Sequence, residues 1–167
     1  MANALLSPFP LSHALFAPIS WCSSLKSVIL QRIIINTIMS YNLLKGKRGI
    51  IFGALNDMSI AWKVAERCAE EGASIVLSNT EMALRMGELD ALAKKINAPV
   101  VAADATSYED LENVFVKAQE LLGGKIDFVL HSIGMSPNVR KRRTYDDLDY
   151  NWLNKTLDIS AISFHKM

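Results

Sequence analysis

The chain has 167 residues, a length that suits one ordinary domain. Half of the residues are apolar and 21% are charged, the composition of a globular protein with a buried core. The formal net charge is +1, so no overall field attracts the chain to nucleic acid or to an anionic membrane, and we expect neither as a partner. The two cysteines, Cys22 and Cys68, cannot form a disulfide framework, and no Cys or His spacing indicates a metal site.

Residues 1–40 differ in composition from the remainder. They contain Lys26 and Arg32 but no acidic residue, and Arg32 interrupts an apolar run far shorter than the roughly 18–20 residues that cross a bilayer. Met39 stands directly before the first globular pattern. We therefore expect residues 1–40 to be a leader, disordered or upstream of the true start codon, with at most a short helix around Leu25–Ile38; a targeting peptide is the alternative.

The first elements after the leader alternate between strand and helix. Arg48–Gly53 is a short apolar run that ends in glycine, a pattern typical of a buried parallel strand. A helix is expected over Ile60–Glu71, ending at Gly72, and a second strand over Ala73–Leu77. The apolar residues of this helix stand at helical spacing: Ile60, Ala61, Val64, Ala65 and Cys68.

The next segments continue the alternation. A single helix is predicted over Glu81–Ile96, and a third strand over Pro99–Ala103. A further helix runs from Ser107 to Leu122. The buried stripe expected for the helix over 81–96 is Leu84, Leu89, Leu92 and Ile96.

The C-terminal part begins with a fourth strand over Ile126–His131. Ser107 with Asp110, and later Thr144 with Asp147, have the spacing of a helix capping box. The second pair predicts a last helical region that runs to the end of the sequence, with a break near Asp158.

Strands and helices alternate throughout, and each connection is long enough for a right-handed crossover. These features predict an α/β fold: a Rossmann-type doubly wound parallel sheet, incomplete, with about four strands and flanking helices. Residues 41–167 would then form the N-terminal part of a dinucleotide-binding domain.

The end of the first strand is a candidate phosphate site, because ligands of such sheets bind beyond the carboxyl ends of the strands. Gly53 lets the backbone approach a diphosphate, and the following helix directs free N–H groups at that anion. Ser59 at the helix entrance can hydrogen-bond a phosphate oxygen. The spacing is not GxGxxG, so an ordinary turn is the alternative interpretation.

The other strand ends carry further candidates. Asp104 follows the third strand, where a carboxylate can accept a hydrogen bond from an adenine amino group; turn formation or helix capping is the other interpretation. After the fourth strand, Gly134 lets the chain pass close to a ribose and a nicotinamide. His131 lies within the strand pattern and is interpreted as a core histidine.

These motifs occur in the order and spacing of the short-chain dehydrogenase/reductase superfamily. The wide turn with Ser59-Ile60-Ala61 resembles the enoyl-acyl-carrier-protein reductase branch of bacterial type II fatty acid synthesis. The resemblance covers residues 41–167. The segments that carry it are Leu44–Arg48, Gly53–Ala61, Asp104-Ala105, His131–Gly134 and Asp158–Ser160.

The resemblance implies roles for particular residues. Those that would contact the cofactor, from its diphosphate through its adenosine to its nicotinamide ribose, are Gly53, Ser59 and Ile60, then Thr80, Asp104 and Ala105, and finally Ile133. Ser136 would meet the acyl substrate. The implied reaction is transfer of a hydride from NADH to the β-carbon of a trans-2-enoyl thioester.

The cofactor expected from the resemblance is NADH. The usual NAD signature, an acid at the tip of the second strand, is absent, because that stretch reads Ser78-Asn79-Thr80-Glu81. Arg85 stands one helical turn further on, where it meets a 2′-phosphate or lies on a solvated helix face. NADPH therefore stays open as an alternative.

The catalytic pair that the family implies, Tyr-x6-Lys, does not occur in these residues, since none of the four tyrosines is followed by lysine at that spacing. No catalytic residue is assigned, and the chain is expected to be an N-terminal fragment of a reductase. Another member of the superfamily, or a non-catalytic dinucleotide-binding fragment, is the alternative.

The resemblance also implies partners. The full-length protein is expected to be a cytoplasmic homotetramer that takes its enoyl substrate from an acyl carrier protein. The basic run Arg140–Arg143 stands on the predicted substrate side and is placed to meet an acidic carrier protein. A solvated loop, neutralised by the nearby Asp146 and Asp147, is the alternative interpretation.

Overall fold

A four-stranded parallel sheet organises residues 40–86 and 88–167, the residues that this computed structural model describes. The leader predicted over residues 1–40 lies outside them apart from Ser40, as does the short helix predicted around Leu25–Ile38. The strands are β1 (Arg48–Phe52), β2 (Ser74–Asn79), β3 (Val100–Ala102) and β4 (Phe128–His131). Their order across the sheet is β3-β2-β1-β4. This arrangement confirms the predicted parallel, Rossmann-type α/β fold.

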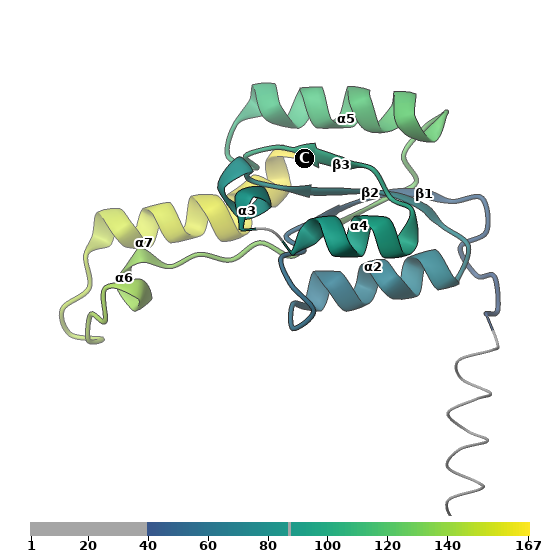
Figure 1. Cartoon of the computed structure of the whole chain (residues 1–167). Helices are drawn as coiled ribbons and strands as arrows, with labels where there is room; N and C mark the ends of the chain where they lie inside the picture. The colour runs from purple at the N-terminus through teal and green to yellow at the C-terminus, as the bar shows by residue number, and fades with distance from the viewer. Residues whose placement is uncertain (1–39, 87) are drawn as a thin grey trace, which may run out of the picture. The chain divides into compact units, whose positions relative to one another are not determined.

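Helices cover both faces of the sheet (Figure 1). They are α2 (Ile60–Glu70), α3 (Glu81–Arg85), α4 (Leu89–Ile96), α5 (Tyr108–Leu122), α6 (Pro137–Arg140), α7 (Tyr150–Leu157) and α8 (Ser163–Lys166), with a π-helical turn, η1 (Asp158–Ile162), between the last two. Figure 1 shows α2 and α4 on one side of the sheet and α5 on the other. Among the described residues, no helix has the length and apolar content needed to span a bilayer.

Two apolar clusters, one on each face, hold these layers together. Successive strand residues point to opposite faces, so Ile51 and Leu77 pack under α2 and α4, while Ile50 and Val76 pack under α5. All four side chains are fully buried. The uninterrupted apolar runs of β1 and β2 follow from this double burial.

The single helix predicted over residues 81–96 is wrong. Two helices occupy this range, since α3 ends at Arg85 and α4 begins at Leu89. The sequence places Gly87 between them, and glycine is a poor helix former. The expected buried stripe nevertheless packs on the core, with Leu89 and Leu92 fully buried.

Two other expectations need correction. Ile60, predicted on the apolar side of its helix, is 75% exposed because it stands at the first position of α2. The last helix begins at Tyr150 rather than at Thr144, and its cap is Asp149, whose carboxylate accepts hydrogen bonds from the Asn151 and Trp152 N–H groups. The predicted break near Asp158 coincides with the π turn.

Candidate functional site

A cleft of about 770 Å³ opens at the carboxyl ends of the strands, where the topology places ligand sites. Five of the seven residues predicted to contact a cofactor line it: Gly53, Thr80, Asp104, Ala105 and Ile133. Because they come from four separate strand ends, only the fold brings them together. Ser59 and Ile60 lie outside its lining, and Ser136 lines an adjoining groove of about 350 Å³.

Gly53 sits where the ends of β1 and β4 nearly touch. Its φ of +93° falls in the region that favours glycine, and a Cβ built on it would stand 2.1 Å from the carbonyl oxygen of Ser132. The Gly53 N–H donates to the Ser78 carbonyl of β2 at 3.0 Å. A side chain at this position would push the loop after β4 away from the cleft.

The amino end of α2 faces the turn that follows Gly53. Ser59 is the N-cap residue, but its hydroxyl does not cap the helix; it donates to the Asn56 carbonyl at 2.7 Å and accepts from the Leu55 N–H at 3.3 Å. Ser59 therefore shapes the wide turn itself. The first-turn N–H groups of α2 have no side-chain cap, so they are available to an anion.

Asn79 is a residue of the cleft that the sequence analysis missed. It ends β2, and its side-chain amide donates to the Ala54 carbonyl at 2.9 Å, which ties the tip of β2 to the turn after β1. Its Oδ1 accepts from the N–H of Thr80, whose hydroxyl in turn accepts from Ala83 N–H at the start of α3. The sequence signal that could have identified Asn79 is an amide side chain at the end of one predicted strand, beside the wide turn that follows the neighbouring strand.

Asp104 takes part in a turn and still presents a free carboxylate oxygen. Its Oδ1 accepts from the backbone N–H and the hydroxyl of Thr106, at 2.9 and 2.7 Å. Ser107 caps α5 as predicted, since its hydroxyl accepts from the Asp110 N–H at 3.3 Å. The Asp110 carboxylate accepts from the Asp104 N–H at 2.8 Å, so it supports this turn and does not complete the capping box. The second oxygen of Asp104, Oδ2, makes no hydrogen bond within the described residues and can accept one from an amino group.

The end of β4 rests on the C-terminal helical segment. His131 Nε2 lies 2.7 Å from the hydroxyl of Ser163, which is fully buried and donates to the Ile159 carbonyl at 2.6 Å. Because that hydroxyl has only one proton, the imidazole must donate to it through Nε2–H. Burial lowers the pKa of His131 below its ordinary value of 6.5, which favours this neutral ring. His131 thus has the hydrogen-bond partner expected of a core histidine, but it is only half-buried.

Arg140 and Lys155 add positive charge to the cleft lining. They belong to α6 and α7. Arg140 was predicted only as part of the basic run that meets a carrier protein, and Lys155 was not predicted, because their approach to the cleft depends on how the two helices pack. Arg140 also lines the adjoining groove together with Ser136, so it stands where the two hollows meet.

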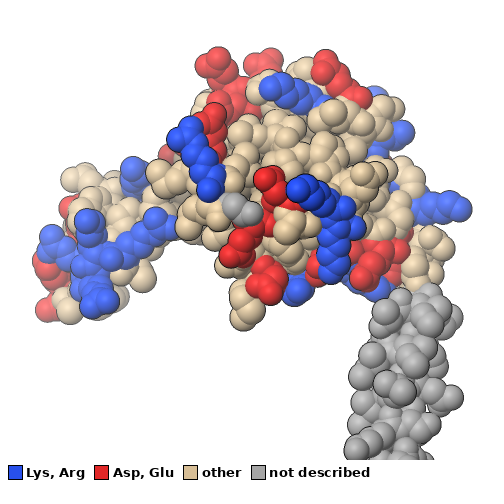
Figure 2. All heavy atoms as spheres, viewed as in Figure 1, with Lys and Arg blue, Asp and Glu red and all other residues tan. Residues whose placement is uncertain are grey.

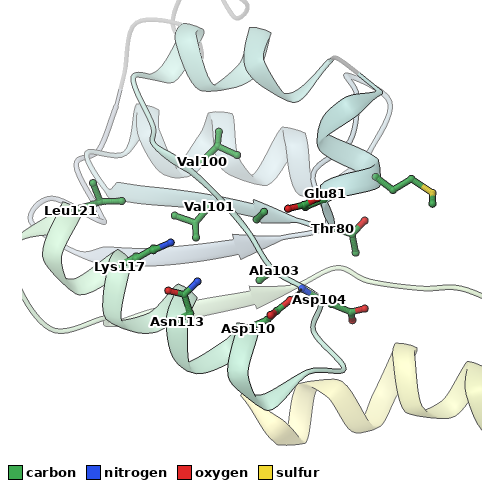
Figure 3. Close-up of a pocket in the computed structure, with 12 residues that line it drawn as sticks. Thr80, Glu81, Val100, Val101, Ala103, Asp104, Asp110, Asn113, Lys117 and Leu121 are labelled. Carbon is green, nitrogen blue, oxygen red and sulfur yellow. Dashed lines mark hydrogen bonds between the residues drawn. The ribbon is translucent and has the colours of Figure 1, made fainter.

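A second, shallower groove of about 910 Å³ runs along the free edge of β3 (Figure 3). Val100 and Val101 form its floor on the strand, and Asn113 and Lys117 of α5 border it. Asp104 lies at its end nearest the carboxyl edge of the sheet and lines both hollows. The cleft at the strand ends is the stronger candidate, because it joins all four strand ends.

Comparisons with known proteins agree with this geometry. The family model described as Enoyl-(Acyl carrier protein) reductase matches residues 53–167. An enoyl-[acyl-carrier-protein] reductase [NADH] from Rhizobium meliloti is 38% identical over 123 residues, which are 73% of this chain and 44% of that protein.

Solved structures give the same result. The crystal structure of FabI from Alistipes finegoldii is 72% identical with a TM-score of 0.73, over 75% of this chain and 48% of that one. The FabI–NADH complex from the same organism has the same identity and TM-score and is covered over 44% of its length. The chain thus spans about half the length of the relatives it matches.

Proposed function

The chain belongs to the enoyl-(acyl carrier protein) reductase family, and on this premise we propose that the protein reduces trans-2-enoyl thioesters of acyl carrier protein with NADH. The observation that carries the proposal is the cleft that joins the four strand ends, lined by residues that sequence motifs had already singled out. When bound, NADH supplies the hydride. We further propose that residues 41–167 are the N-terminal part of the dinucleotide-binding domain.

The residues present fit a dinucleotide in this cleft. Gly53 allows the chain after β1 to approach the Ser132 backbone, which keeps both strand ends at the cleft, and the N–H groups at the start of α2, which the Ser59 side chain does not cap, suit a diphosphate. Asp104 would accept from the adenine amino group, Thr80 and Ala105 would adjoin the adenosine, and Ile133 would lie along the nicotinamide ribose. In this proposal Ser59 supports the turn, while Ile60, exposed beside it, covers the diphosphate.

An absorbance assay of NADH consumption tests the proposal. The protein expressed from its complete gene should oxidise NADH when a trans-2-enoyl thioester is added and should not do so with a saturated thioester. NADPH, assayed in parallel, should be used less well, since Arg85 is already paired with Glu81 at 3.0 Å. Failure to oxidise NADH with any enoyl thioester would contradict the proposed activity.

The proposal extends to the carrier protein as partner. Figure 2 shows Lys and Arg side chains gathered over the part of the molecule that α6 and α7 occupy. Arg140, Lys141 and Arg142 are exposed. Of the four basic residues of this run, Arg143 alone forms a salt bridge within the described part of the chain, with Asp147. A basic surface beside the Ser136 groove suits an acidic carrier. Added salt should therefore raise the KM for carrier-bound substrate more than that for a small thioester.

We also propose, from the family, a cytoplasmic homotetramer. The C-terminal helical segment supports self-association, because Leu157, Ile162 and Phe164 leave about half of their surface exposed. Light scattering after size exclusion should give a mass four times that of the subunit, and a monomer would contradict this part of the proposal.

A second candidate function is dinucleotide binding without turnover. It is favoured by one observation: these 167 residues hold no Tyr-x6-Lys pair. The same assay separates the two functions, because a binding module takes up NADH, seen as a change in its fluorescence, but does not oxidise it.

A further inference from the structure

The C-terminal helical segment is tied to the strand ends through polar side chains. Three of them reach across: Ser160 to Met135, Ser163 to His131, and Lys166 to the carbonyl of Thr106. Each contact ends on a segment that lines the cleft or adjoins it. The segment therefore fixes the positions of the loops around the candidate site.

Ser160 makes the contact nearest the proposed substrate side. Its hydroxyl accepts from the Met135 N–H at 3.1 Å and lies 3.5 Å from the Met135 carbonyl oxygen, to which it can donate. Met135 belongs to the loop 132–136, which has no regular secondary structure. The other end of that loop is held by a hydrogen bond from the Ser132 N–H to the Phe52 carbonyl, at 3.2 Å. Ser160 is thus the second of two anchors.

The π turn explains how one helical segment contacts both the loop after β4 and the end of β4 itself. A π turn inserts one residue into an α-helix and so rotates everything after it by about 100° around the axis. Ser160 lies inside η1, whereas Ser163 and Lys166 follow it. A regular helix would lose this combination of contacts. Such turns occur frequently at functional sites.

Ser160 and Ser136 line the same groove of about 350 Å³. This groove shares Gly134, Met135 and Arg140 with the cleft, so the two hollows adjoin each other. A substrate in the groove would lie next to a cofactor in the cleft. The loop between them is held in place by the hydroxyl of Ser160.

We propose that Ser160 is a positioning residue for the acyl substrate: through Met135 it holds the backbone of Ser136 at the groove where the enoyl thioester binds. This inference rests on the proposed function and adds a residue to it. Ser160 does not touch the reacting atoms. Its substitution should therefore change substrate binding and leave cofactor binding intact.

Steady-state kinetics of the protein expressed from its complete gene test this split. Ser160→Ala should raise the KM for the enoyl thioester about fivefold to tenfold, the value of one hydrogen bond, and change the Kd for NADH by less than about twofold. Ser160→Thr, which keeps the hydroxyl, should restore most of the loss. The matched control is Ser74→Ala, because Ser74 is an exposed serine at the start of β2 that lines neither hollow.

Hydrogen exchange of the Met135 amide gives a readout that needs no turnover. The Met135 amide should be protected in the wild type and in Ser74→Ala, and should exchange at least about tenfold faster in Ser160→Ala. Should that variant not fold, Ser160→Cys, with its weaker acceptor, should give an intermediate rate. Unchanged protection in the variants would overturn the inference even if the enzyme is active. Lost protection in an inactive protein would instead contradict only the proposed reaction.

Discussion

The centre of the sheet and the C-terminal helical segment, residues 150–167, are held in place by different interactions. In β1 and β2 the side chains from Ile50 to Phe52 and from Ile75 to Leu77 are buried on both faces. In contrast, α7 has no buried residue, and its segment contacts the strand ends through hydroxyl, imidazole and ammonium groups. The centre thus owes its stability to apolar packing, whereas the segment is held by hydrogen bonds together with contacts of Met167 with the core and of Phe164 with the His131 ring. Substitutions in the two regions should act by different mechanisms.

The largest difference should come from shortening a leucine in each region. Leu77→Ala leaves a cavity at a position with no exposed surface and should lower the free energy of unfolding by about 2–5 kcal/mol. Leu157→Ala, at a side chain that is 49% exposed within the subunit, should lower the free energy of unfolding of the dissociated subunit by less than about 1 kcal/mol. Urea denaturation measures both, and equal losses would break the comparison.

Two glycines beside the cleft offer the next test. Gly53→Ala combines a positive φ with a clash against the Ser132 backbone and should cost about 1–3 kcal/mol and weaken NADH binding. Gly134→Ala is the control for stability alone, because a Cβ there meets no protein atom within 4 Å. Denaturation should distinguish the two variants, and NADH titration measures the loss of binding in Gly53→Ala. An unaffected Gly53→Ala variant would contradict the close approach of β1 and β4.

Two fully buried serines, one in each region, allow a comparison of smaller effects on stability. Ser163→Ala leaves the Nε2–H of His131 without an acceptor and should lower the free energy of unfolding by about 1–3 kcal/mol. Ser78 of β2 has no hydrogen-bond partner for its hydroxyl among the described residues, so Ser78→Ala should leave stability unchanged or raise it by up to about 1 kcal/mol. A destabilised Ser78→Ala protein would show that its hydroxyl has a partner.

The smallest effect concerns pH. Because the pKa of His131 is lowered in the folded protein, the unfolded chain binds a proton first as the pH falls. The contribution of the neutral imidazole is therefore complete above the ordinary pKa of 6.5 and is lost as the pH falls through the folded pKa. The melting temperature should drop between about pH 7.5 and about pH 5.5, and less so in His131→Gln. Identical pH profiles would exclude this role.

Much of the architecture could be predicted from the sequence, because buried strands and capped helices leave local patterns. Gly53, Asp104 and Ile133 could be chosen because each directly follows an apolar run, and parallel topology brings such positions to one edge. The helix start was misplaced at Thr144 because Thr144 and Asp149 are both residue types that cap helices, and the packing of α6 against α7 selects Asp149. Asn138 makes that choice, exchanging hydrogen bonds with the Asp149 backbone at 3.0 Å.

The remaining site residues could not be predicted, since their partners are distant in sequence. Ser160 is 25 residues from Met135, and its approach depends on a π turn that has no sequence signature of its own. Arg140 and Lys155 reach the cleft only because α6 and α7 pack beside it. Ile60 was expected to be buried because helical spacing does not reveal which end of a helix is exposed.

The central claim is that one dinucleotide occupies the cleft at the strand ends. An NADH titration of ¹⁵N-labelled protein, followed by amide chemical shifts, tests it most directly. The amides of Gly53, Asp104 and Ile133 should shift together and give the same Kd. Shifts confined to Asn113 and Lys117, in the groove along β3, or no shifts at all, would contradict it.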